Sequence, residues 1–398
     1  MSSSFSAAGH FSGEFDEAAL QEWAKQLRAQ LPAQNVSLGL IFISPTFFPH
    51  ASQVLEVLRL SAQTPILAGC SSQGLIYSGF EIEENPGIVL ALYSLPGVEL
   101  HGVHISQSQV EEAEAKGFWQ HQTGIDPSRT NGWLTFLDPF SMDSEAWLKT
   151  WNRDFNELPV LGGLASGNFR EQVTQLYLNG EVYQEGGVAL SVGGAVELRG
   201  VTCQGCTPIG ETWTLTKVEE NVIHTIGNRP AYKVLAETFN ELAPDEQRHA
   251  QGNLLIGLAM DEYVEEFHRG DFLIRNLLRA DSSSGSLAIG ALPRPGQTVQ
   301  FQLRSARAAN EDMQELLTRA KQRLGSAKVY GGCLCSCNGR GQGLFGRPNH
   351  DAGMVQSVLG PIGLAGFFCN GEIGPVGKRN FLHGYTASLA LFVEKLTT

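Results

Sequence analysis

The part of the chain after residue 328 holds side chains suited to binding a small charged molecule. Arg340 can pair with a carboxylate through two hydrogen bonds, and Glu372 can accept an amine. The other candidates to orient a ligand are Asn338, Asn349, His350, Asn370, His383 and Tyr385. Most of these residues lie beside a glycine near the end of a strand-like run, where α/β folds build their sites. We therefore predict a ligand site in which Arg340, Glu372 and His383 converge.

Polar residues in this region also have structural interpretations. Arg340 and Glu372 can instead pair only with each other as a buried bridge. Asp351 suits the N-cap of the helix that follows it, because a short acidic side chain accepts the first backbone N–H groups of a helix.

The cysteines suggest thiol chemistry at one position and no metal site. Cys333, Cys335 and Cys337 alternate along one strand, so they share a face but lie about 6.6 Å apart per pair, too far for one tetrahedral zinc. We predict no metal and no cofactor. Cys369 lies next to Asn370-Gly371-Glu372, and His383 is the nearest candidate base. An enzyme that uses Cys369, His383 or Glu372 for thiol or acid–base chemistry is therefore an alternative.

The charge balance excludes one class of partner. The formal net charge is −13 in 398 residues, and only 17% of the residues are charged. An acidic excess of this kind argues against binding to a nucleic-acid backbone. The N-terminus has no apolar signal segment, and no apolar run approaches the ~18 residues of a membrane span. With seven cysteines in a chain of this length, we expect reduced thiols and a cytoplasmic location.

A unit recurs three times along the chain. Each copy contains a strand, a one-faced helix, a Pro-apolar-Gly string and a second apolar strand. The strings begin at Pro65, Pro159 and Pro361, and the copies cover residues 38–94, 132–193 and 329–392. We predict that the three copies share strand order and direction. A fourth, degenerate copy is expected at residues 253–289. The pattern predicts an α/β fold with two domains built from duplicated strand–helix–strand units, whose mixed sheets are covered by helices.

The expected domains are an N-terminal helical extension at 1–30, an N-terminal domain at 31–225 and a C-terminal domain at 226–398. The boundary between the two domains lies near Glu219 to Arg229, where the chain passes through the turn signal Gly227-Asn228-Arg229-Pro230. Apolar spacing also predicts a helix through Leu20 and Leu27, one at 231–242, and one that starts from an Asn310 cap and runs to Leu324.

Several strings resemble those of the FIST (F-box and intracellular signal transduction) family. They are Gly69-Cys70-Ser71-Ser72-Gln73-Gly74, Arg275-Asn276 with Asp281, Cys337-Asn338-Gly339-Arg340-Gly341, Asn349-His350-Asp351, and the segment from Gly366 to Tyr385. The resemblance covers about residues 30 to 395. It implies a FIST N-terminal and a FIST C-terminal domain, and a sensory module for small ligands such as amino acids.

We therefore expect a cytoplasmic sensor whose ligand is an amino acid or a related metabolite, and more a binding protein than an enzyme. The chain leaves no room for an attached effector domain, so a separate downstream signalling protein is the expected partner. An adaptor that works through protein contacts is the remaining alternative. Saturable binding without turnover would distinguish the sensor from both.

Overall fold

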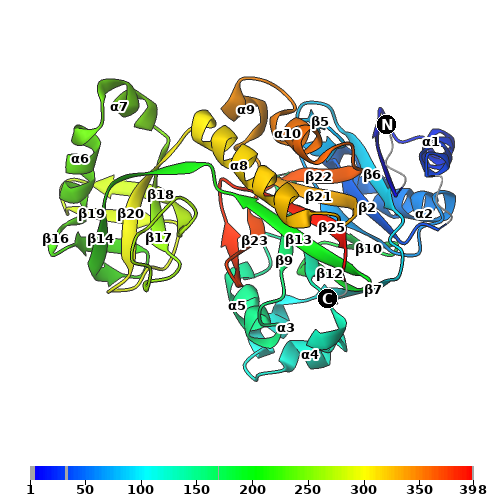
Figure 1. Cartoon of the computed structure of the whole chain (residues 1–398), viewed down its shortest axis with the longest axis horizontal. Coiled ribbons are helices and arrows are strands. Elements are labelled where there is room, and N and C mark those ends of the chain that lie inside the picture. The colour runs from blue at the N-terminus through cyan, green and yellow to red at the C-terminus, as the bar shows by residue number, and fades with distance from the viewer. Residues whose placement is uncertain (1–4, 32–34, 169, 397–398) are drawn as a thin grey trace. The chain divides into compact units, whose positions relative to one another are not determined.

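The computed structural model describes residues 5–31, 35–168 and 170–396. The chain forms two compact units (Figure 1). The larger unit consists of Met1–Thr202 and Gln314–Thr398, and the smaller unit is Cys203–Met313. The predicted α/β class with mixed sheets is confirmed. Among the described residues, every helix is too short or too polar to cross a membrane.

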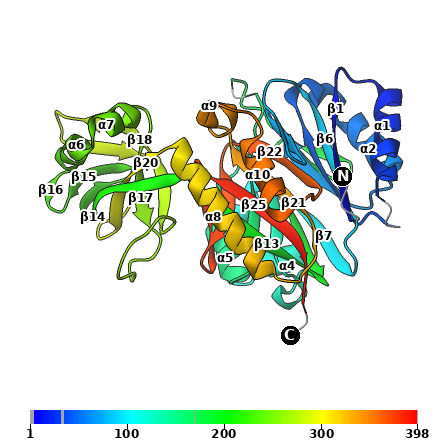
Figure 2. The same ribbon diagram turned by 45° about the horizontal axis from the view of Figure 1, so that its top comes forward.

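Three six-stranded sheets build the larger unit (Figure 2). The first has the order β1 (Ser6–Ser12), β6 (Gly87–Tyr93), β2 (Leu38–Ile43), β3 (Leu67–Ser71), β10 (Leu176–Leu178) and β11 (Glu181–Tyr183). The second has the order β7 (Val98–Ile105), β12 (Gly187–Gly194), β8 (Trp133–Leu137), β9 (Val160–Leu164), β23 (Glu372–Val376) and β24 (Arg379–His383). The third has the order β13 (Val196–Cys203), β25 (Ala387–Glu394), β21 (Val329–Cys337), β22 (Leu364–Cys369), β4 (Leu75–Tyr77) and β5 (Phe80–Ile82).

The predicted repetition is confirmed, because strand order and direction agree in all three copies. The first two strands of each copy are parallel: β2 with β3, β8 with β9, and β21 with β22. The last strand of each copy runs antiparallel to its first strand. Gly69, Gly162 and Gly366 mark the same position, since each faces the neighbouring strand where a Cβ would meet a carbonyl oxygen.

Each copy gives its hairpin to a different copy's sheet. The hairpin β4–β5 of the first copy pairs with β22, and β10–β11 of the second copy pairs with β3. The hairpin β23–β24 of the third copy pairs with β9. The exchange is cyclic, so no sheet is completed by its own copy alone.

Helices connect the parallel strands as predicted. They are η1 (Pro45–His50) and α2 (Ala51–Ser61) in the first copy, α5 (Ser144–Asp154) in the second, and α9 (Gly341–Phe345) and α10 (His350–Leu359) in the third. The expected N-terminal helix is α1 (Glu17–Ala29), which buries Leu20 and Leu27. The preceding edge strand β1 was not predicted. The second copy also has α3 (Gln107–Glu112), α4 (Phe118–Thr123) and η2 (Pro127–Arg129) before β8.

One apolar core lies between the three sheets. Each sheet contributes a phenylalanine to its centre: Phe42, Phe136 and Phe367. The ring centroids are 5.5 Å apart for Phe42 and Phe136, 4.8 Å for Phe42 and Phe367, and 5.9 Å for Phe136 and Phe367. The shared core means that the three copies form one body.

The smaller unit is a closed sheet with helices. Its strand order is β14 (Cys206–Glu219), β20 (Thr298–Arg304), β17 (Leu254–Ala259), β18 (Phe272–Asp281), β19 (Ser286–Ile289), β15 (Val222–Ile226) and β16 (Arg229–Pro230), and β14 also pairs with β15. Its helices are α6 (Ala231–Glu241), α7 (Pro244–Ala250) and the first part of α8 (Ala306–Leu324).

Two expectations about this region are wrong. Strands β17, β18 and β19 pair antiparallel, so residues 253–289 are not a fourth copy, which would need a parallel pair. The helix expected from Asn310 starts at Ala306, and the Ser305 hydroxyl accepts the Ala308 N–H at 3.0 Å. The apolar spacing located the helix correctly, but a serine rather than Asn310 caps it.

Candidate functional site

The predicted site residues gather where β21 and β22 end. These strands are parallel and adjacent, so Asn338 and Asn370, which follow them, lie side by side. Asn338 Nδ2 donates to Asn370 Oδ1 at 2.8 Å, and Asn370 Nδ2 donates to the Ala165 carbonyl at 2.9 Å. Both asparagines are exposed. They form the outer surface of the candidate site.

Arg340 is buried near this surface. Its guanidinium was expected to bind a ligand carboxylate, with a bridge to Glu372 as the alternative, but it binds Asp351. Arg340 Nε donates to Asp351 Oδ2 at 2.6 Å, and Nη2 donates to Oδ1 at 2.9 Å. Both side chains are fully buried. Burial alone would raise the pKa of Asp351, but the Arg340 charge and the hydrogen bonds outweigh it and hold that pKa well below its ordinary value. Asp351 is thus not the N-cap of α10, which is Asn349.

His350 and Phe345 complete the surroundings of the ion pair. His350 Nδ1 lies 2.9 Å from Asp351 Oδ1. The His350 ring stacks on Phe345 with centroids 3.4 Å apart, and the Arg340 guanidinium carbon lies 5.3 Å from the centroid of the same ring. Asn349 adopts a φ of 60°, in the left-handed region that asparagine tolerates.

Glu81 is a site residue that the sequence analysis missed. It comes from β5 in the exchanged hairpin and accepts the backbone N–H groups of His350 at 3.1 Å and Ala352 at 2.9 Å. It therefore caps α10 from another copy of the unit. Burial and then the negative charge of Asp351 raise the pKa of Glu81 to about 7. An isolated glutamate far away in the sequence carries no signal of this contact.

Glu372 is completely buried at a position that is apolar in the other copies. It faces β9 where Leu75 faces β22 and Leu176 faces β3, and both leucines belong to the central core. Glu372 Oε1 lies 3.2 Å from Cys369 Sγ, and Oε2 accepts the Thr386 N–H at 2.9 Å. Burial raises the pKa of Glu372 to about 8, and these hydrogen bonds together with the Arg340 charge offset only part of that rise.

His383 is the last residue of β24, and Tyr385 follows two residues later. His383 is the direct cross-strand partner of Glu372 in the hairpin β23–β24, and its Nε2 lies 3.0 Å from the Gly374 carbonyl oxygen. Tyr385 is half-buried with a φ of 62°, which is uncommon for an aromatic residue. The structure therefore brings Glu372 and His383 together, with the Arg340 charge close to Glu372.

The cysteines are all free. Cys333 and Cys335 point into the central core, as the alternation predicted. Burial and the neighbouring Glu372 raise the pKa of the Cys369 thiol well above its ordinary value. Among the described residues, no group of three or more His, Cys, Asp or Glu side chains could hold a metal ion.

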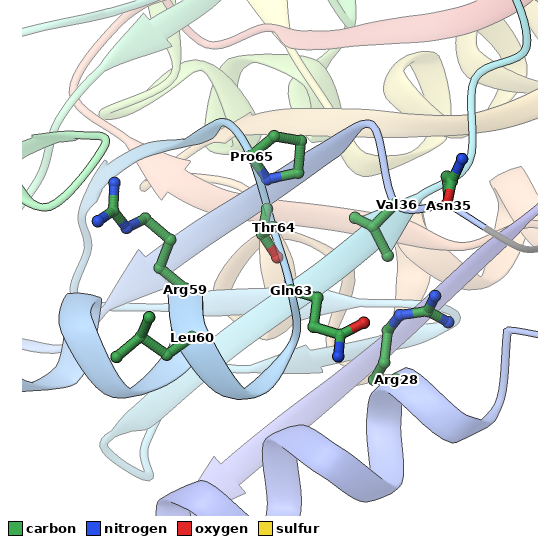
Figure 3. A pocket seen from close by; sticks show the side chains of 8 residues that line it. All are labelled: Arg28, Asn35, Val36, Arg59, Leu60, Gln63, Thr64 and Pro65. Carbon is green, nitrogen blue, oxygen red and sulfur yellow. The ribbon is translucent and has the colours of Figure 1, made fainter.

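Two hollows lie elsewhere on the larger unit. The first has a volume of about 550 Å³ and is lined by Arg28, Asn35, Val36, Arg59, Leu60, Gln63, Thr64 and Pro65 (Figure 3). The second, of about 630 Å³, shares Asn35 and Pro65 with it. Neither hollow contains a residue of the candidate site, and both are open at the surface.

Comparison with known proteins identifies relatives of the whole chain. The FIST N domain family matches residues 37–229, and the FIST C domain family matches residues 231–375. An uncharacterized protein of Mycobacterium tuberculosis is 37% identical over 378 residues, which cover 94% of this chain and 96% of that protein. An uncharacterized protein of Mycobacterium bovis is 36% identical over 379 residues, covering 94% and 95%.

Two solved structures align over 98% of the chain. One is described as a cyanuric acid hydrolase, with a TM-score of 0.31, 9% identity and 100% of its own chain covered. The other is a cyanuric acid hydrolase from A. caulinodans, with a TM-score of 0.33, 8% identity and 99% covered. Both likenesses are too weak to support a conclusion about this chain.

Proposed function

Because the chain belongs to the FIST family, we propose that it is a cytoplasmic sensory protein that binds a small amine-bearing molecule, such as an amino acid, at the ends of β21 and β22. The site would consist of Asn338, Arg340, Asn349, His350, Asn370, Glu372, His383 and Tyr385. A separate signalling protein would receive the signal. The free state of all seven cysteines supports the cytoplasmic location.

The burial of Glu372 is the observation that carries the proposal. The other two copies place a leucine, Leu75 or Leu176, in the apolar core at this position. A fully buried carboxyl group with a pKa of about 8 stabilises nothing by packing, and its ionised form is costly without a cation. Such groups cluster at functional sites. The third copy therefore differs from its sisters in the way that a binding site requires.

The balance of charge favours a cationic ligand. Two buried carboxyl groups, Asp351 and Glu372, lie near one guanidinium, that of Arg340, and a third, Glu81, lies near Asp351. Asp351 accepts hydrogen bonds from Arg340 Nε and Nη2, so these two donors are not open to a ligand carboxylate. Arg340 therefore contributes to the site mainly through its positive charge. The Arg340 charge is already paired with Asp351, so an ammonium group would give Glu372 a direct cationic partner. The hydrogen-bonded pair Asn338–Asn370 would contact the polar remainder of the ligand.

The enzyme alternative has weaker support. A cysteine that attacks a substrate at neutral pH needs a lowered pKa, whereas that of Cys369 is raised. The His383 Nε2 atom already lies 3.0 Å from the Gly374 carbonyl oxygen. Binding without turnover therefore fits the geometry better than thiol catalysis.

The test compares ligands that differ only in the amine. Thermal shift and calorimetry at pH 8.5 would use amino acids, their deaminated carboxylic acids and simple alkyl amines. We expect binding only by amine-bearing compounds. Glu372→Gln should weaken it by about 10- to 100-fold, the loss of one charge-assisted hydrogen bond worth about 1.5–3 kcal/mol. Glu84→Gln, at an exposed glutamate two residues after Ile82, is the matched control and should bind normally.

Three outcomes would contradict the proposal. Amine-bearing compounds that never raise the melting temperature would exclude the ligand class. Equal affinity in the Glu372→Gln variant would remove the ligand from this site. Consumption of the bound compound would make the protein an enzyme, and a protein partner retained without any small-molecule binding would make it an adaptor.

A further inference from the structure

Cys337 and Cys369 lie directly opposite each other on neighbouring strands. They are register partners at the ends of β21 and β22, whereas Cys333 and Cys335 face Ala365 and Phe367. Paired residues on adjacent strands share a face, and their Cα atoms are about 4.8 Å apart. That separation lies within the 4.4–6.8 Å range found across disulfides, as a general rule. Of the cysteines on β21, Cys337 alone faces another cysteine.

Both thiols also contact one carboxyl group. Cys369 Sγ lies 3.2 Å from Glu372 Oε1, and the Cys337 side chain hydrogen-bonds to Glu372 as well. Cys337 is half-buried, and Cys369 is fully buried. An oxidant can therefore reach the first thiol. Above about pH 8, where Glu372 is ionised, the second thiol lies beside a proton acceptor.

We propose that Cys337 and Cys369 form a reversible disulfide when the protein meets a hydroperoxide, and that Glu372 accepts the proton released as the bond closes. This modification site stands apart from the proposed ligand, because it rests on the two thiols and their shared carboxyl group.

The chemistry takes two balanced steps. The Cys337 sulfur attacks the outer oxygen of the hydroperoxide, the O–O bond breaks, and an alcohol or water leaves as Cys337 becomes a sulfenic acid. The Cys369 sulfur then attacks the Cys337 sulfur. Glu372 takes the Cys369 thiol proton and passes it to the departing hydroxyl group, which leaves as water. The hydroperoxide is reduced by two electrons, and the two thiols are oxidised to one disulfide. A dithiol reductant reverses the result.

The sister copies offer variants that are compatible with the fold. The residue equivalent to Cys337 is Ser44 in the first copy, and the residue equivalent to Cys369 is Ala165 in the second. Cys337→Ser and Cys369→Ala therefore introduce side chains that already occupy the equivalent strand ends in the other copies. Cys203→Ser, in the smaller unit, is the control.

The experiment treats the full chain with hydrogen peroxide at about pH 9, where Glu372 is ionised. The remaining thiols are then alkylated under denaturing conditions, and the peptides are mapped by mass spectrometry. We expect alkylatable thiols to fall from seven to five, with residues 337 and 369 joined, and dithiothreitol to restore seven. Cys337→Ser and Cys369→Ala should each prevent the bond, and Cys203→Ser should not. Glu372→Gln should slow bond closure at least about tenfold, since a positioned base typically contributes more than that.

Retention of seven thiols, a bond between other cysteines, or a Cys337 sulfinic acid beside a free Cys369 would each overturn the proposal. If the disulfide closes at the normal rate in Glu372→Gln, Glu372 is not the base that accepts the thiol proton. That result would also contradict the proposal. Because all these results are read from covalent bonds, failure of the proposed ligand would not alter them.

Discussion

Glu372 places an ionisable group in an apolar core position, and the consequence depends on pH. Its pKa is about 8 in the folded protein against an ordinary 4.5, so between these values the folded state holds a proton that the unfolded state has released. The free energy of unfolding therefore falls as pH rises from about 4.5 to 8. Glu81, with a pKa of about 7, contributes in the same direction. Chemical denaturation of the unliganded protein at pH 5, 7 and 9 should show this decline.

Glu372→Leu tests the origin of the decline. Leucine is the residue of both sister copies, so we expect this variant to be more stable than the parent chain at pH 9 and to lose the part of the decline between pH 7 and 8. The decline that remains, from Glu81, should end near pH 7. An unchanged pH profile in Glu372→Leu would mean that Glu372 is not the group that titrates.

Arg340→Ala should destabilise the protein strongly. The substitution leaves the Asp351 carboxylate buried without its bidentate partner, which costs about 3–5 kcal/mol. Urea unfolding measures the loss directly. Arg347→Ala, at an exposed arginine in the same loop region, should change stability by less than about 0.5 kcal/mol. Equal stability of the two variants would contradict a structural role for the Arg340–Asp351 pair.

Residue identities in the site were predictable to different degrees. Glycine-flanked polar residues at strand ends pointed to Arg340, Glu372 and His383, but the partner of Arg340 was not predictable, because Asp351 also fits a helix cap. When the sequences of the first and third copies are aligned on Gly69 and Gly366, Glu372 aligns with Leu75, since each lies six residues after its glycine. Such an alignment of the copies is the signal that identifies Glu372 as out of place. Glu81 reaches the site only through the exchanged hairpin.

At the scale of elements, three equivalent glycines allow the parallel strands to approach. A Cβ at Gly69 would lie 1.7 Å from the Ile41 carbonyl oxygen, one at Gly162 would lie 1.8 Å from that of Thr135, and one at Gly366 would lie 2.0 Å from that of Leu334. These atoms belong to the backbone and cannot move aside. Alanine at each position should destabilise the protein by about 3 kcal/mol, measured by urea unfolding.

Gly343→Ala provides the control for these substitutions. Gly343 lies in α9, and a Cβ there meets no atom within 4 Å. Alanine should be neutral or stabilise the protein by up to about 1 kcal/mol. A tolerated alanine at Gly69, Gly162 or Gly366 would show that the copies do not share this strand contact.

The elements themselves followed from local patterns. Apolar residues three and four apart located α2, α5, α8 and α10, because one-faced helices must cover a sheet. The choice of sheet for each hairpin did not follow, since a strand of three to five residues does not indicate which of three similar edges it joins. The edge strand β1 was missed for a related reason. Its residues change from buried at Ser6 and Ala7 to exposed at Ser12, and they show no alternation of apolar and polar side chains.

At the scale of the whole molecule, cyclic hairpin exchange should make the larger unit fold as one body. The fragment 1–202 has the strands of two copies, but it lacks β22, which pairs with β4, and β23, which pairs with β9. We expect this fragment to show no cooperative thermal unfolding by circular dichroism. Co-expression with the fragment 203–398 should restore a folded complex.

The fragment 203–313 is the matched control. Its sheet closes within that range and has its own apolar cluster, so it should unfold cooperatively when expressed alone. Cooperative unfolding of the isolated fragment 1–202 would contradict the requirement for exchange. The expected domain boundary between residues 225 and 226 stays a prediction. The fragments 1–202 and 203–313 instead end where the compact units of the structure end.

The exchanged hairpin also imposes an order on biosynthesis. β4–β5 leaves the ribosome early, but its partner β22 is made only after residues 203–313 have been translated. At 5–20 residues per second, the stretch from 203 to 369 takes roughly 8–33 s. During that interval the nascent chain carries a hairpin and the edge of β9 without partners, and bare strand edges promote aggregation. The speed of translation across the smaller unit should therefore set the fraction of chains that reach the native state.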